Sequence, residues 1–210
     1  NLGIDYLDWI VETHHHSDHY GGLQDVVNSS IDYGLYWSPS QNSYNFQPGD
    51  NVPFSQAVQT KVLAIAPDAA NTNDQSIVLK MSYGNIDFIF TGDAEAASEN
   101  EQIAQFGDAL AAEVLKIGHH GSHTSSSAGY LEHVWSESIQ LGVISAGYLN
   151  PYGHPHNLWR FQEADVFCLN RADNNNYFNI TDDSGTVKML TDGVFLEVVL
   201  SKLSFHQGDQ

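Results

Sequence analysis

Short apolar runs alternating with helical patterns are the feature that most restricts how this chain can fold. The runs that read as strands cover residues 9–12, 36–37, 60–66, 113–117, 141–145 and 166–169, and the helical patterns cover residues 22–30, 95–106 and 157–163. This alternation is typical of α/β proteins, in which helices cover the faces of a sheet. We therefore expect an α/β fold, built as a single domain over residues 1–210.

Two antiparallel segments add to this pattern. Residues 76–83 and 86–91 flank Gly84-Asn85, which predicts a β-hairpin because Gly and Asn tolerate the positive φ angles of a tight turn. Residues 186–190 and 194–200 predict a last pair of antiparallel strands.

The charge of the chain limits its partners. Twenty-six Asp and Glu against seven Lys and Arg give a formal net charge of −19, which repels polyanions at long range. Nucleic acid is thus disfavoured as a partner on charge grounds.

The single cysteine, Cys168, excludes an internal disulfide. No apolar run is long enough to span a membrane, and the acidic composition weakly favours an extracytoplasmic or secreted setting. The sequence does not predict an oligomeric state.

The histidines are clustered in a way that points to metal chemistry. Residues 13–19, Thr-His-His-His-Ser-Asp-His, follow a predicted strand and precede a helix, and they contain the spacing H-x-H-x-D-H. In an extended loop His14 and His16 point the same way and can share one cation, while Asp18 and His19 turn to a second. Imidazole and carboxylate ligands suit Zn²⁺, with Mn²⁺ or Fe as alternatives.

This loop resembles the hallmark of the metallo-β-lactamase superfamily, and Ile89-Phe-Thr-Gly-Asp93 resembles its later strand followed by Gly-Asp. The C-terminal domain of ComEC-type DNA-uptake competence proteins is a closer resemblance over residues 4–190. It is carried by residues 73–79, Thr91-Gly-Asp93, Leu115-Lys-Ile-Gly-His-His-Gly-Ser122 and Asn150-Pro-Tyr-Gly-His-Pro-His156. The resemblance implies a four-layer αββα sandwich, here expected to lack its N-terminal strands because the histidine loop begins at residue 14.

The resemblance also implies a set of ligands for two divalent metals. His14 and His16 would bind one metal and Asp18 and His19 the other, with Asp93 bridging them and His120 as the late ligand. This chain departs from the family pattern in two ways. His16 stands where the competence domains often have Asp, and no histidine lies near Thr72 to Asp74, where Asn73 or Asp74 could supply oxygen instead.

The remaining histidines suggest catalytic roles. Because neighbours at a strand end point to opposite faces, we expect His119 and His120 to divide their tasks. We take His120 as the ligand and His119 as the group that serves the leaving oxygen, although the reverse order is open. His154, in a loop after a strand, would be a second such group, and Asp18 would orient the nucleophile.

Together these features predict a dinuclear metal-dependent hydrolase that uses a metal-activated water. Phosphodiesters, including nucleic acid, are the leading substrates by resemblance. Hydrolysis of a small carboxylic ester or lactone is one alternative, and it needs no basic surface. A non-catalytic binding domain is another, although such a domain would be expected to lose ligands.

Overall fold

The computed structural model describes residues 4–40, 45–136, 139–147, 150–156, 158–161, 164–169, 180–181 and 184–202. Its strands are β1 (Tyr6–Val11), β2 (Asp32–Trp37), β3 (Asn51–Val52), β4 (Gln59–Ala64), β5 (Val78–Tyr83), β6 (Ile86–Phe90), β7 (Val114–Lys116), β8 (Leu141–Ser145), β9 (Asp165–Leu169), β10 (Ile180–Thr181), β11 (Ser184–Thr191) and β12 (Leu196–Lys202). The α-helices are α1 (Ser17–Val27), α2 (Ala96–Phe106) and α3 (Ala128–Val134). Short 3₁₀ helices cover Asn73–Gln75, Gly107–Leu110, His119–Gly121 and Leu158–Phe161.

A mixed eight-stranded sheet organises the molecule. Its strand order is β10-β9-β8-β7-β6-β5-β4-β3. Strands β3 to β6 pair antiparallel, whereas β6 to β10 run parallel. Because parallel strands end at the same edge of a sheet, the loops after β6, β7 and β8 emerge side by side.

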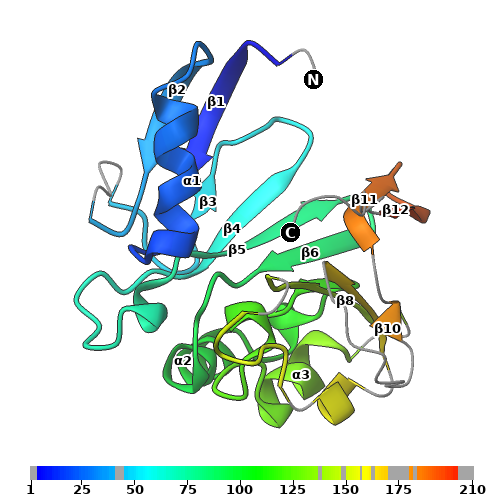
Figure 1. Cartoon of the computed structure of the whole chain (residues 1–210). Helices are drawn as coiled ribbons and strands as arrows, with labels where there is room; N and C mark the ends of the chain where they lie inside the picture. The colour runs from blue at the N-terminus through cyan, green and yellow to red at the C-terminus, as the bar shows by residue number, and fades with distance from the viewer. Residues whose placement is uncertain are drawn as a thin grey trace.

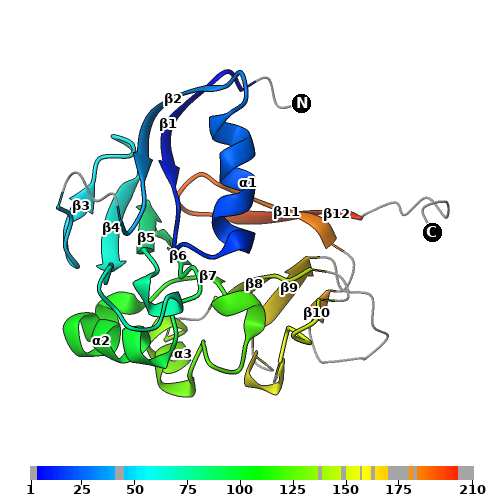
Figure 2. The ribbon, with the colours of Figure 1, turned by 60° about the vertical axis from the view of Figure 1, so that its left-hand side comes forward.

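The two faces of this sheet are covered differently. Helices α2 and α3 lie against one face, while the parallel pair β1-β2, helix α1 and the β11-β12 hairpin lie on the other side (Figures 1 and 2). The helical side buries the larger core, including Ile89, Leu115, Ile117 and Tyr130. A second core around Trp37 joins β2 to the opposite face. The predicted α/β class is confirmed, and the layering is compatible with an αββα sandwich.

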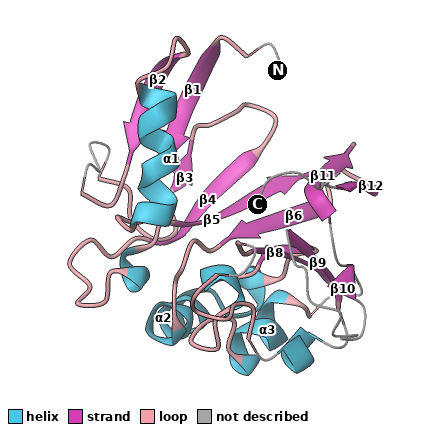
Figure 3. Cartoon of the chain, in the orientation of Figure 1, coloured by secondary structure: helices cyan, strands magenta, loops and turns pink. Residues whose placement is uncertain are grey.

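The elements agree with the sequence patterns except at several points, as Figure 3 shows by element type. The β5-β6 hairpin forms as predicted, with Tyr83 paired to Ile86. Helix α1 starts at Ser17 rather than Gly22, so Asp18 and His19 belong to its first turn. Residues 157–163 were expected to form an α-helix, but the described part of this segment is a 3₁₀ helix.

Helix α3 and the two-residue strand β3 were not predicted, because each is too short to show its apolar pattern clearly. The hydroxyl of Ser127 accepts a hydrogen bond from the backbone N–H of Tyr130 and caps α3. No helix among the described residues is long and apolar enough to cross a membrane.

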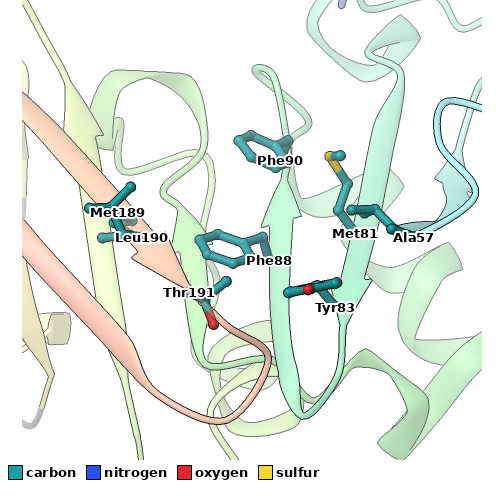
Figure 4. Close-up of a pocket in the computed structure, with 9 residues that line it drawn as sticks. Ala57, Met81, Tyr83, Phe88, Phe90, Met189, Leu190 and Thr191 are labelled. Carbon is teal, nitrogen blue, oxygen red and sulfur yellow. The ribbon is translucent and has the colours of Figure 1, made fainter.

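An apolar cavity of about 580 Å³ separates the β11 strand from the β5-β6 hairpin. Met81 and Tyr83 of β5, Phe88 and Phe90 of β6, and Met189 of β11 line it (Figure 4). The rings of Phe88 and Phe90 stack with their centroids 6.5 Å apart. Alternation along β6 turns these rings away from Ile89, which faces the helical core.

The hairpin turn offers a test of the packing between β5-β6 and β11-β12. Gly84 has φ +60°, and a Cβ there would lie 2.3 Å from the carbonyl oxygen of Gly193. We expect Gly84→Ala to lower the free energy of unfolding by roughly 1–3 kcal/mol through backbone strain and this clash. Urea denaturation would measure the change.

Gly129→Ala is the matched control. Gly129 lies within α3, and the nearest atom to an added Cβ is 4.0 Å away. Alanine there should be neutral or stabilise the protein by up to about 1 kcal/mol. Equal effects of the two substitutions would contradict the packing described here.

Candidate metal centre

The histidine clusters meet at one edge of the molecule, where several strands end. The residues 14–19 follow β1, Asp93 follows β6, and His119 and His120 follow β7. Loops at the carboxyl ends of strands are the usual place for ligand sites in α/β proteins. The topology therefore brings together segments that lie about a hundred residues apart.

A single carboxylate oxygen lies at the middle of this group. The Oδ2 atom of Asp93 is 3.2 Å from Nε2 of His19 and 3.5 Å from Nε2 of His120. The Nε2 atoms of His14 and His119 each lie 3.8 Å from the same oxygen. Four imidazole rings from two loops thus surround one buried carboxylate.

Two groups of side chains have the spacing needed to hold a cation. The first comprises His14, His19 and Asp93, and the second comprises Asp18, His19 and His120; the ligand atoms within each group lie within 4.8 Å of one another. His19 belongs to both groups, whereas the family resemblance implied Asp93 as the bridge between the two metals. His16 joins neither group, but its Nδ1 lies 3.0 Å from Nε2 of His14. All six predicted ligands are therefore brought together.

Burial and charge determine the protonation of the centre. Burial and the nearby charge of His19 lower the pKa of His14 to about 4, so its ring is neutral at pH 7. Burial acts to raise the pKa of Asp93, but the hydrogen bond and charge of His19, with the charges of His120 and His119, outweigh it. The pKa of this carboxyl is held well below its usual range.

The turn after β7 lets both of its histidines face the centre. His119 and His120 have φ angles of 47° and 53°, in the left-handed region, which costs a non-glycine residue roughly 1–3 kcal/mol. The expectation that these neighbours point to opposite faces is wrong, because it assumed an extended backbone. Their division into ligand and proton donor stays a prediction.

Each of these two rings is held through its Nδ1 atom. His120 Nδ1 lies 2.6 Å from the carbonyl oxygen of Ser145, to which it donates. His119 Nδ1 lies 3.1 Å from Oε1 of Glu95 and 3.2 Å from the hydroxyl of Thr124. Both Nε2 atoms are thereby left to face Asp93. Anchoring of this kind is the usual way in which proteins orient a metal-binding or proton-transferring imidazole.

Glu95 is itself fixed by neutral donors. The amides of Asn71 and Asn73 donate to its two carboxylate oxygens at 2.7 and 3.0 Å, and the Thr124 hydroxyl donates at 2.8 Å. Burial acts to raise the pKa of Glu95, but these hydrogen bonds lower it overall. A carboxylate held ionised beside Nδ1 favours a proton on that nitrogen of His119.

The carboxylate of Glu12 helps to hold the histidine loop of residues 14–19. Glu12 is buried, and its Oε1 lies 2.8 Å from Nδ1 of His15. Its Oε2 accepts a short hydrogen bond from the hydroxyl of Tyr36 on β2. This arrangement turns His15 away from the centre and leaves His14 and His16 on the inner side.

The structure also places the other predicted residues. The ring of His154 lies beside the centre, with its centroid 5.4 Å from that of His119 and 6.2 Å from that of His120. Burial, followed by the neighbouring charge of His156, lowers the pKa of His154 to about 4. Asp18 is largely exposed and its Oδ2 lies 3.2 Å from Nε2 of His120.

The segment expected to replace a missing histidine holds Glu95 and the start of α2. Oδ1 of Asp74 accepts hydrogen bonds from the backbone N–H groups of Glu95 and Ser98, which caps the start of α2. Asn73 uses its amide nitrogen to hold Glu95. Oδ1 of Asn73 is buried and has no hydrogen-bond partner among the described residues, so its part as an oxygen ligand stays a prediction.

Glu12, Tyr36 and Glu95 were not found by sequence reasoning. Glu95 carried a detectable signal, since it is a carboxylate two residues after the strand-ending Gly-Asp pair. Tyr36 carried none, because only the pairing of β1 with β2 brings it over Glu12.

The residues present fit a metal centre. Oδ1 of Asp93 is buried and has no hydrogen-bond partner among the described residues. Buried carboxylate oxygens are normally satisfied, and a cation would satisfy this one. The neutral ring of His14 presents a nitrogen lone pair, and His120, which donates from Nδ1 to Ser145, would present one from Nε2 after losing the proton on that nitrogen, as metal binding requires.

Fold and site together define a mixed α/β protein with a candidate metal centre at the ends of its strands. No family model matches the chain. It is 34% identical over 159 residues to "Competence protein ComA" of Neisseria gonorrhoeae, covering 73% of this chain and 22% of that protein. It is 31% identical over 206 residues to "ComE operon protein 3" of Bacillus subtilis, covering 89% of this chain and 25% of the relative.

"Recombination protein 2" of Haemophilus influenzae is 31% identical over 159 residues, which is 71% of this chain and 19% of the relative. The chain thus spans about a quarter or less of the length of the curated relatives it matches. Its homology to competence proteins, predicted from the motifs, is confirmed.

The Glu12 network provides a test of how the first histidine loop is held. Tyr36→Phe removes the hydroxyl that donates to buried Glu12, so we expect a loss of roughly 1–3 kcal/mol in the free energy of unfolding. Tyr33→Phe on the same strand is the control, because Tyr33 is 39% exposed and should change stability by less than about 0.5 kcal/mol. Urea titration of metal-free protein would detect the difference, and an unchanged Tyr36→Phe variant would argue against the network.

Proposed function

We propose that this chain is a metal-dependent hydrolase of the metallo-β-lactamase type, and that it acts on phosphodiester bonds. The observation that carries the proposal is the convergence of four imidazole Nε2 atoms on Oδ2 of Asp93, within 3.8 Å. The partnerless Oδ1 of the same carboxylate supports it. A structural role alone would not need so many titratable groups in one place.

Six residues would hold two divalent cations: His14, His16, Asp18, His19, Asp93 and His120. Zn²⁺ suits this mixture of imidazole and carboxylate, with Mn²⁺ or Fe as alternatives. When bound, such cations lower the pKa of water and neutralise charge on the attacked oxygens.

The remaining side chains supply orientation and proton transfer. Asp18, on the exposed side of the centre, would orient the attacking water. His119 would serve the leaving oxygen through Nε2, because Glu95 and Thr124 hold its Nδ1. Burial lowers the pKa of His154 to about 4, so its ring is neutral near pH 7 and would hydrogen-bond the leaving oxygen rather than protonate it.

Homology and charge favour different substrates. The relatives named for competence favour a phosphodiester, with nucleic acid as the natural polymer and an extracytoplasmic setting. A formal net charge of −19 opposes the approach of a long polyanion. That charge favours a second candidate, hydrolysis of a small carboxylic ester or lactone, in which the same groups act at a carbonyl carbon. A purely binding role is less well supported, because all six predicted ligands are present and close together.

The metal content is the first test of this proposal. We expect elemental analysis of protein purified without a chelator to find close to two transition-metal ions per chain. Asp93→Asn should lower both the metal content and the activity, because the buried side chain at the middle of the centre loses its charge but keeps its shape. Asp25→Asn, at an exposed position of α1, is the control and should match the wild type. A metal-free wild type with no uptake on dialysis would refute the centre.

The substrate class is the second test. Bis(p-nitrophenyl) phosphate, a p-nitrophenyl carboxylic ester, a lactone and single-stranded DNA would be assayed with Zn²⁺ and Mn²⁺ across a salt series. We expect phosphodiester turnover to exceed ester turnover at least tenfold, which is about 1.4 kcal/mol of transition-state stabilisation. DNA cleavage should be weak at low salt and should not fall steeply as salt rises, since few cations contact the phosphates. The opposite ranking would favour the esterase.

A further inference from the structure

A second pair of histidines lies beside the centre, outside the groups described above. His123 follows the His-His-Gly turn, and His156 belongs to the loop after β8. Their Nδ1 atoms face each other at 3.2 Å, and the ring centroids are 5.1 Å apart. Two ring nitrogens at this distance share one proton, or both direct lone pairs at a cation between them.

The tautomer of His156 makes its Nδ1 an acceptor, which can take a proton from His123 or bind a cation. Its Nε2 lies 2.9 Å from the carbonyl oxygen of Tyr152, to which it donates. The proton of a neutral ring therefore sits on Nε2, and Nδ1 presents a lone pair toward His123. The carbonyl of Ser145 orients His120 in the same manner. Donation of the far ring N–H to a backbone carbonyl is characteristic of metal-binding histidines.

Backbone contacts between the two loops fix the positions of His123 and His156. The backbone N–H of His156 donates to the carbonyl oxygen of Gly121 at 2.8 Å. A Cβ on Gly121 would lie 2.6 Å from Cβ of Pro155, so the two loops pack in direct contact. Asn150 braces the second loop by accepting from the backbone N–H of His154 and donating to its carbonyl oxygen. The carbonyl oxygen of His123 accepts from Arg160 at 3.2 Å.

We propose that His123 and His156 form a third transition-metal site at the rim of the centre, with water completing the coordination. His123 is exposed, so solvent reaches the position between the rings. Imidazole nitrogens select Zn²⁺, Cu²⁺ or Ni²⁺ over Mg²⁺ or Ca²⁺. With only two protein ligands, this site binds its ion more weakly than the centre does.

An ion in this position would add positive charge near the centre. The ring of His154 lies between the pair and the centre, 4.7 Å from that of His156 and 5.4 Å from that of His119. The third site would thus place positive charge beside the centre, in a chain whose formal net charge is −19. The binding itself does not depend on hydrolytic activity.

Equilibrium dialysis against a Zn²⁺ series tests the proposal. We expect the wild type to take up one more ion, at higher free Zn²⁺, than His123→Ala and His156→Ala do. His133→Ala is the matched control, because His133 is partly exposed and hydrogen-bonds a carbonyl oxygen through its Nδ1. It should match the wild type. Thermal melting of the metal-free variants verifies that each folds.

A variant without the centre separates this site from the proposed function. In Asp93→Asn/His120→Ala, one weakly bound Zn²⁺ should remain, and adding His123→Ala should remove it. Equal uptake by the wild type and both rim variants at every Zn²⁺ concentration would overturn the third site. So would an equal loss in His133→Ala, since that would indicate unspecific binding to surface histidines.

Discussion

The carboxylate of Asp93 can remain ionised with only 3% of its side chain exposed because imidazole rings surround it. Burying an unpaired charge costs several kcal/mol, and here His19, His120 and His119 offset that cost. The backbone N–H of Asp93 donates to Ser76, whose hydroxyl also lies 3.3 Å from Nδ1 of His14. The positions of both histidine loops therefore depend on one another through this residue.

The arrangement of strands in the sheet brings these loops to Asp93 with little rearrangement of the backbone. The parallel strands β6, β7 and β8 end at one edge, so each loop needs only a short excursion to reach the carboxylate. In the loop after β7, His119, His120 and Ser126 have left-handed φ angles. Hydrogen bonds from the backbone N–H of His119 to Gly92, and from that of Ser122 to His119, hold this turn in place.

Sequence reasoning reached the fold class and the centre because both depend on local patterns. The H-x-H-x-D-H spacing and the apolar runs are visible without tertiary contacts, and the resemblance to competence domains supplied Asp93 and His120 as expected ligands. The supporting residues were not accessible in this way. Glu12 meets Tyr36 only through the pairing of β1 with β2. The orientation of His119 and His120 depends on left-handed backbone angles that nothing in Gly-His-His-Gly requires, so the assumption of an extended strand end failed.

Two cationic side chains near the centre, Lys116 and Arg160, donate hydrogen bonds to backbone carbonyl oxygens. Any affinity for phosphate would therefore come from the residues of the centre itself. Burial lowers the pKa of Lys116, and its Nζ donates to the carbonyl oxygen of Ile117. Arg160 donates to the carbonyl oxygens of His123 and Ser125. These charges are directed into the protein, and the acidic surface opposes long-range attraction. An anionic substrate would therefore be selected by short-range contacts at the histidine cluster, where screening by salt has little effect.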